Sequence, residues 1–155
     1  YQEIENKIID AAPPPVNLEK EKKIIDILLQ LHTKNLLTAA HDISDGGLLT
    51  AICEMLFKDN LGLNLNLPKS FLKIDSKDPI LHSWCFGEDQ GRIIVATNKI
   101  DKVKFCLKDS NLDYFVLGKT NASNNLNLND ITTISIKCLK NSYERTLPLI
   151  MGKDK

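Results

Sequence analysis

The spacing of apolar residues changes from a helical period to a two-residue period at Leu61, and this change decides which folds the chain can adopt. Apolar residues recur at helical spacing from Leu48 to Leu56, which predicts a helix. Leucines then alternate with glycine or asparagine from Leu61 to Leu67, as in a strand with one buried face. Pro68 ends that strand because proline cannot donate to a sheet. The chain is therefore expected to combine helices with a sheet.

The same patterns predict the remaining elements. Further helices are expected over residues 18–34, 78–84, 100–107 and 141–151, the first of them capped by Asn17. Further strands are expected within residues 36–42, 93–97, 114–117 and 131–136, with 93–97 as a central strand covered on both faces. Residues 69–77 are expected to form a polar connector, 86–92 a turn and the asparagine-rich stretch 118–130 a loop. The predicted fold is α/β or α+β, with a mixed sheet of four to five strands and helices packed on it.

Three consecutive prolines, Pro13 to Pro15, impose a stiff, extended backbone near the start of the chain. Residues 1–16 are therefore interpreted as a linker and residues 17–155 as a single domain. The sequence begins with Tyr1 rather than methionine, which suggests a segment of a longer protein.

Composition argues against several classes of function. Lys plus Arg and Asp plus Glu both number 20, so no net positive charge attracts nucleic acid or an acidic membrane. The longest apolar runs, such as Ile24 to Leu31 with its single Asp26, are far shorter than the roughly 20 residues of a membrane span. The cysteines lack C-x-x-C spacing and lie in apolar segments, which favours buried thiols in a reducing, cytoplasmic compartment over disulfides or zinc. They are Cys53, Cys85, Cys106 and Cys138.

The first chemically distinctive segment is His41-Asp42-Ile43-Ser44-Asp45-Gly46-Gly47, between a predicted strand and a predicted helix. Three interpretations stay open. In the first, Ser44 or Asp45 caps the helix. In the second, the Gly46 and Gly47 amides and the positive end of the helix dipole bind a phosphate. In the third, His41, Asp42 and Asp45 bind a metal ion.

The second segment is Gly87-Glu88-Asp89-Gln90-Gly91-Arg92, directly before the apolar strand at Ile93. A guanidinium can hold a carboxylate or a phosphate with two hydrogen bonds. Arg92 therefore either pairs with Glu88 or Asp89 and locks the turn, or acts with the Asp45 turn in a functional site.

Three segments in this order resemble the synthetase subunit family of phosphoribosylformylglycinamidine synthases. They are Pro13–Lys22, Ala40–Leu48 followed by Glu54-Met55, and Phe86–Arg92. The resemblance runs from Ala12 to the end and implies the C-terminal domain of the second repeat, with the fold of the aminoimidazole ribonucleotide synthetase C-terminal domain. Thiamine-monophosphate kinases resemble only the first turn, so the second turn favours the synthase. Asn17 replaces the usual aspartate and can still cap a helix.

The resemblance implies a part in an ATP-dependent ligase of purine synthesis that converts formylglycinamide ribonucleotide to its amidine with glutamine-derived ammonia. ATP and Mg²⁺ are the implied cofactors; the partners are upstream domains, a glutaminase subunit and a small accessory subunit. The family's catalytic histidine and most magnesium ligands lie upstream, so no catalytic or metal-binding residue is expected here and the chain alone is expected to be inactive. Ser44, Asp45, Gly46 and Gly47 are predicted to bind a phosphate of substrate or nucleotide. The predicted cleft-lining residues are His41, Asp42, Glu88, Asp89, Gln90 and Arg92.

A second hypothesis stays open beside the ligase. The chain would then be a non-catalytic module of the same superfamily that binds a phosphate ligand or a partner protein.

Overall fold

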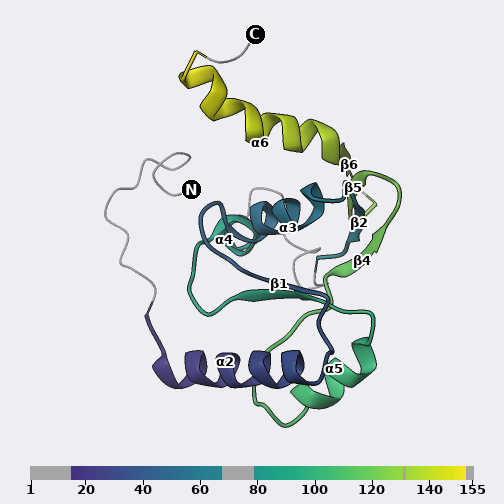
Figure 1. Cartoon of the computed structure of the whole chain (residues 1–155). Helices are drawn as coiled ribbons and strands as arrows, with labels where there is room; N and C mark the ends of the chain where they lie inside the picture. Colours follow the sequence, from purple (N-terminus) through teal and green to yellow (C-terminus); the bar gives the residue numbers. More distant parts are fainter. Residues whose placement is uncertain (1–14, 68–78, 131, 153–155) are drawn as a thin grey trace. The chain divides into compact units, whose positions relative to one another are not determined.

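The computed structural model describes residues 15–67, 79–130 and 132–152, and the chain divides into two compact units (Figure 1). Unit 1 comprises Tyr1–Ala51 and His82–Tyr114. Unit 2 comprises Ile52–Leu81 and Phe115–Lys155. Most of the predicted linker, residues 1–14, and the predicted connector over residues 69–77 lie outside the described residues.

The described elements confirm a mixed α/β architecture. In chain order they are α2 (Leu18–Thr33), β1 (Ala39–Asp42), α3 (Gly47–Phe57), β2 (Gly62–Leu65), α4 (Pro79–Phe86), β3 (Ile93–Ala96), α5 (Ile100–Leu107), β4 (Gly118–Asn121), β5 (Asn125–Leu128), β6 (Thr132–Ser135) and α6 (Ile136–Ile150). Within these residues no helix is long and apolar enough to cross a membrane.

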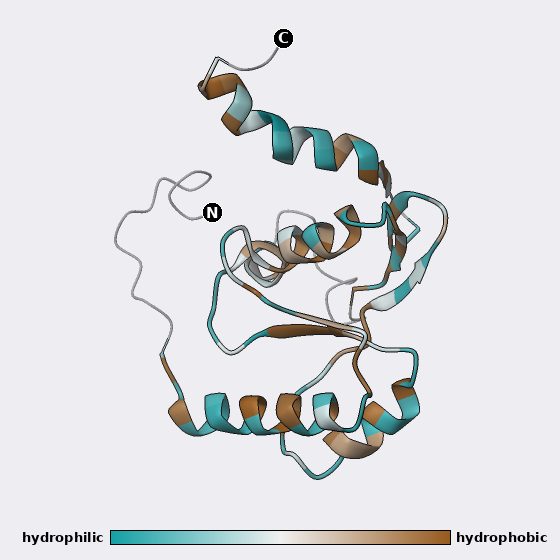
Figure 2. Cartoon of the chain, in the orientation of Figure 1, coloured by the Kyte–Doolittle hydropathy of each residue, from teal (hydrophilic) through white to brown (hydrophobic). Residues whose placement is uncertain are grey.

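Unit 1 is built on an antiparallel pair of strands, β1 and β3, with α2 and α5 side by side on one side of it (Figure 1). A small core of Leu31, Leu36 and Val103 joins the two helices. The expectation that β3 is a central strand covered on both faces is wrong. Strand β3 is hydrophobic throughout (Figure 2), but its residues are only half-buried and its sheet has two strands.

The predicted cap of the first helix is confirmed. The Asn17 side chain accepts a hydrogen bond from the Lys20 backbone N–H at 3.0 Å, which satisfies one of the free donors at the start of α2. Glu19 and Glu21 lie in the first turn, where negative charge complements the helix dipole.

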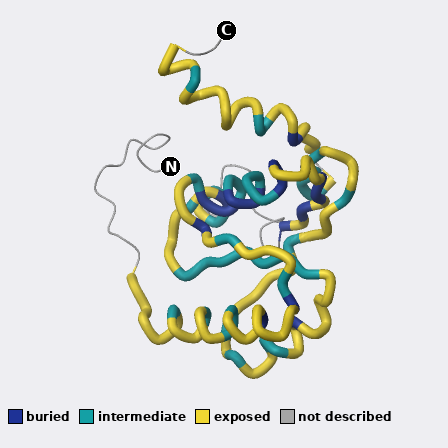
Figure 3. Tube along the Cα trace, viewed as in Figure 1, coloured by how far each residue is buried: buried dark blue, intermediate teal, exposed yellow. Residues whose placement is uncertain are grey.

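Unit 2 contains a four-stranded mixed sheet in the order β4-β2-β5-β6. Strand β2 pairs antiparallel with β4 and parallel with β5, and β5 pairs antiparallel with β6. Leu63, Leu65 and Leu126 are buried on one face, whereas Asn64 on the alternate position of β2 is exposed (Figure 3). The predicted one-faced strand is thereby confirmed over Gly62–Leu65, whereas Leu61 lies before the strand and is exposed.

Two predictions in the second half of the chain are wrong. No strand is assigned at residues 114–117, where Tyr114, Phe115 and Val116 are exposed. The predicted loop over residues 118–130 instead contains β4 and β5. Asparagine is a poor strand former, but here the polar positions alternate with Leu126, which packs into the buried face of the sheet.

Strands β4 and β5 lie on opposite sides of β2, so the short connection between them must cross the beginning of β2. It does so at Gly62, where an added Cβ atom would lie 2.3 Å from the Asn121 side-chain oxygen and 2.4 Å from the Ser123 hydroxyl oxygen. Glycine suits this position because a side chain would displace those two side chains and would approach the Asn125 carbonyl oxygen to 2.9 Å.

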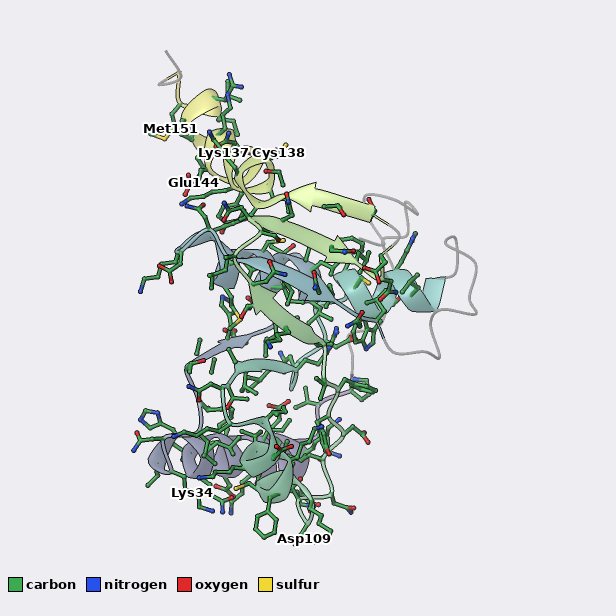
Figure 4. The ribbon with its side chains drawn as sticks, turned by 90° about the vertical axis from the view of Figure 1, so that its right-hand side faces the viewer. Lys34, Asp109, Lys137, Cys138, Glu144 and Met151 are labelled. Atoms are coloured by element: carbon green, nitrogen blue, oxygen red, sulfur yellow. The ribbon has the colours of Figure 1, made fainter. Side chains whose placement is uncertain are left out.

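Helix α6 begins directly after β6, earlier than the predicted start at Asn141, and its first residue, Ile136, is fully buried. The Tyr143 ring packs against Phe57 with 5.6 Å between centroids, and its hydroxyl lies 2.5 Å from a Glu54 carboxylate oxygen. Figure 4 shows Lys137, Cys138 and Glu144 along this helix. The exposed Cys138 contradicts the expectation that all four thiols are buried; Cys85 is buried, and Cys53 and Cys106 are intermediate.

Candidate functional site

The segment from Ser44 to Gly47 (turn 1) connects β1 to α3 in unit 1. Gly46 and Gly47 adopt φ angles of +80° and +73°, a region that side chains disfavour. The Gly47 N–H donates to the Ser44 carbonyl oxygen at 3.0 Å and closes the turn. Because α3 begins at Gly47, the cap position belongs to Gly46, which has no side chain. The interpretation that Ser44 or Asp45 caps this helix is therefore wrong.

The segment from Gly87 to Arg92 (turn 2) connects α4 to β3. The Arg92 guanidinium donates to the Trp84 carbonyl oxygen at 2.6 Å and to the Gly87 carbonyl oxygen at 3.2 Å. Its carbon also lies 5.9 Å from the centroid of the Trp84 ring. Arg92 therefore locks turn 2 by satisfying carbonyl groups at the end of α4, rather than by the predicted pairing with Glu88 or Asp89.

Burial sets the ionisation of the groups around Arg92. Desolvation lowers the pKa of Arg92, and the nearby Asp89 carboxylate opposes that shift. Desolvation raises the pKa of the Cys85 thiol, and the positive charge of Arg92 opposes it. The Cys85 thiol is therefore favoured in its neutral form, so no activated nucleophile is indicated at this position.

Strand pairing brings the two turns together. In the antiparallel register Asp42 at the end of β1 lies opposite Ile93 at the start of β3, and the Ile43 N–H donates to the Arg92 carbonyl oxygen at 3.0 Å. Turn 1 follows β1 and turn 2 precedes β3, so the two turns meet at the same end of the strand pair.

Two direct contacts join the turns. The Gly46 N–H donates to a Glu88 carboxylate oxygen at 2.9 Å. A Cβ atom added to Gly47 would lie 2.5 Å from the Phe86 carbonyl carbon and 2.6 Å from its Cα atom, so the two backbones touch. The structure thus brings together the two motifs that were distinctive in the sequence.

A third segment, the start of α2, reaches turn 2 through Glu21, for which no contact was predicted from the sequence. Gly91 in turn 2 has a φ of +71°, and a Cβ atom there would lie 2.6 Å from a Glu21 carboxylate oxygen. Glu21 belongs to the first turn of α2 and to the first segment of the family resemblance. Helical spacing could not have revealed this approach, because it depends on how α2 packs against turn 2.

The other predicted site residues lie around these contacts. The His41 Nδ1 atom lies 2.5 Å from the Asp42 carbonyl oxygen and 3.7 Å from an Asp42 carboxylate oxygen. The remaining predicted side chains are exposed, and they are Ser44, Asp45, Asp89 and Gln90. In the described part of the chain, no three His, Cys, Asp or Glu side chains form a group that could hold a metal ion.

The geometry determines what turn 1 can bind. Amides at a glycine turn before a helix are suited to an anion, but here the Gly46 N–H is bonded to Glu88 and the Gly47 N–H to Ser44. An anion at Gly46 would have to replace the Glu88 carboxylate. Two surface depressions of about 630 and 480 Å³ lie elsewhere, and both include Asp101 and Phe105 of α5.

Comparison with known proteins gives concordant matches. The family described as AIR synthase related protein, C-terminal domain, matches residues 2–131. The phosphoribosylformylglycinamidine synthase subunit PurL of Rhodopseudomonas palustris strain TIE-1 is 36% identical over 145 residues, covering 92% of this chain and 19% of that protein. The chain thus spans about a fifth of the length of this curated relative.

Solved structures agree on the fold. T. maritima PurL complexed with FGAR aligns with a TM-score of 0.61 and 22% identity, over 77% of this chain and 20% of that one. The same protein complexed with ATP gives a TM-score of 0.61 and 22% identity, over 76% and 21%. At this identity the likeness establishes the fold alone.

Proposed function

The chain belongs to the family of AIR synthase related proteins, whose C-terminal domain it matches, and from this premise we propose that it works as the C-terminal domain of a phosphoribosylformylglycinamidine synthase. The observation that carries the proposal is 36% identity to such a synthase over 92% of the chain. The proposed enzyme uses ATP to phosphorylate the formamide oxygen of formylglycinamide ribonucleotide (FGAR), and ammonia then displaces the phosphate.

Within that enzyme, we assign turn 1 to holding a phosphate group of the substrate or the nucleotide. The left-handed glycines and the start of α3 support this role, since they gather backbone N–H groups at one spot, where the Gly46 N–H already holds a carboxylate, that of Glu88. The related T. maritima protein is described as complexed with FGAR and with ATP, both of which carry phosphate. His41, Asp42 and the turn 2 residues Glu88 to Gln90 line the proposed cleft, while Arg92 holds turn 2 in shape.

The rest of the chemistry is assigned to the remainder of the longer protein. We place Mg²⁺ binding there, as the resemblance to the synthase family implies. From the likeness to the synthase subunit, we propose the remaining domains, a glutaminase subunit and a small accessory subunit as partners. A cytoplasmic location stays a prediction from this pathway.

The proposal is tested with the purified chain in two assays. With Mg-ATP, ammonia and FGAR, the chain alone should form no amidine product. In NMR titrations, FGAR should shift the amide resonances of Gly46 and Gly47, and its dephosphorylated riboside should not. Amidation by the chain alone, or equal shifts with the riboside, would contradict the proposed role.

A further inference from the structure

A carboxylate of the protein itself occupies the donor that an anion at turn 1 would use. The Gly46 N–H donates to a Glu88 carboxylate oxygen at 2.9 Å. Carboxylate and phosphate oxygens are both acceptors for charge-assisted hydrogen bonds from backbone N–H groups. The two cannot share this single donor at full strength, so the Glu88 contact competes directly with a bound phosphate.

We propose that Glu88 is an internal competitor for the phosphate position at turn 1, and that its side chain swings away when phosphate binds. This inference rests on the proposed function, because Glu88 would regulate the same phosphate site. It assigns to Glu88 the control of phosphate affinity, in addition to its place along the cleft.

The surroundings of Glu88 allow its side chain to move while its backbone stays in place. Arg92 ties the backbone of turn 2 through the Gly87 and Trp84 carbonyl groups, and Gly47 lies against the Phe86 backbone. The Glu88 residue itself is exposed, so its carboxylate regains water when it leaves Gly46. An exposed charged contact of this kind is weak enough for a ligand to displace.

Charge strengthens the competition. A phosphate beside an ionised Glu88 meets like charge, so the carboxylate must leave for electrostatic reasons as well as to free the donor. Asp89 is the neighbouring residue in turn 2 and is also exposed, but the Gly46 N–H is bonded to Glu88. Glu88 and Asp89 therefore have the same charge and are both exposed, but it is Glu88 that accepts the hydrogen bond from Gly46.

The test is a titration of the full chain with inorganic phosphate, followed through the Gly46 and Gly47 amide resonances, in wild type, Glu88→Gln and Asp89→Asn. The Glu88→Gln side chain keeps an oxygen that can accept from Gly46, so turn 1 retains its support while the competing charge is lost. We expect phosphate to bind Glu88→Gln about three- to tenfold more tightly than wild type, the effect of one weakened charged hydrogen bond. Asp89→Asn removes a charge from the same cleft but leaves the acceptor of the Gly46 N–H in place, so it should tighten phosphate binding less than Glu88→Gln does.

The possible results distinguish competition by Glu88 from phosphate binding at turn 1 itself. If phosphate shifts both amides in every variant but binds Glu88→Gln no better than Asp89→Asn, the competition is refuted and the phosphate site stands. If affinity falls in Glu88→Gln, Glu88 supports the site rather than competing with phosphate, and the inference is likewise overturned. If phosphate shifts neither amide even in Glu88→Gln, both the inference and the phosphate role of turn 1 fail.

Discussion

The Gly46 backbone N–H and the Glu88 carboxylate, 42 positions apart in the sequence, are joined by a 2.9 Å hydrogen bond. The bond exists because β1 and β3 pair antiparallel, which places the turn after one strand beside the turn before the other. The two motifs are therefore one structural unit, and a substitution in either turn should alter the structure of the other.

Replacing Gly47 by alanine should destabilise the protein by about 2–4 kcal/mol. The added Cβ atom would combine a φ of +73° with an approach of 2.5 Å to the Phe86 carbonyl carbon, and backbone cannot easily give way. Urea unfolding measures the effect. Gly152→Ala is the matched control, because Gly152 has a φ of +65° but nothing within 4 Å. Equal losses in the two variants would show that the contact with Phe86 is unimportant.

Arg92→Lys should lower the free energy of unfolding by about 1–2 kcal/mol, because an ammonium group cannot reproduce the forked donation to two carbonyl groups. The carbonyl oxygens concerned belong to Trp84 and Gly87. Chemical denaturation of the wild type and of Arg92→Lys makes the comparison. A tolerated Arg92→Lys would mean that charge alone holds turn 2.

Gly62→Ala should weaken the four-stranded sheet by about 1–3 kcal/mol, because the β4–β5 connection passes too close for a methyl group. Hydrogen exchange of the Leu63 and Leu65 amides reports the loss. Adding Ser123→Ala removes one of the atoms nearest to the new methyl group and should restore part of the protection. Unchanged exchange in Gly62→Ala would contradict the close crossing.

Tyr143→Phe should change how stability depends on pH in the alkaline range. The hydrogen bond to Glu54 raises the pKa of Tyr143 above its ordinary value of 10.0, so the fold favours the protonated phenol. This contribution is complete below pH 10 and is lost as pH rises through the raised pKa. The stability difference between wild type and Tyr143→Phe should therefore shrink above about pH 10.

Denaturation curves between pH 8 and pH 11 give that difference. Glu54→Gln removes the same charged partner and should flatten the profile in the same way. Parallel profiles for wild type and Tyr143→Phe would show that the bond to Glu54 does not influence the titration.

Local patterns in the sequence were sufficient for several elements. The helical spacing and the Asn17 cap predicted α2, the stripe from Leu48 to Leu56 predicted α3, and the leucine alternation predicted β2. Each of these signals depends on neighbours within one element, which is why a single sequence carries them.

Other features depend on contacts between distant segments, and the sequence could not supply them. Strands β4 and β5 are polar segments that become strands because β2 provides hydrogen-bonding partners on both of its edges. The identity of the Arg92 acceptors depends on where α4 ends, and the approach of Glu21 to Gly91 depends on how α2 packs. The two motifs were recognisable in the sequence. The hydrogen bond between the Gly46 N–H and the Glu88 carboxylate was not, because it depends on the three-dimensional structure.

Domain replacement tests the central claim most directly. The segment of the R. palustris synthase that matches this chain is exchanged for the chain itself, and the purified chimera is assayed for ammonia-dependent amidation of FGAR with Mg-ATP, with a version lacking the segment as the control. We predict that the chimera forms the amidine and that the shortened control does not. A chimera that folds and binds ATP but forms no amidine would contradict the assignment of this chain to the synthase.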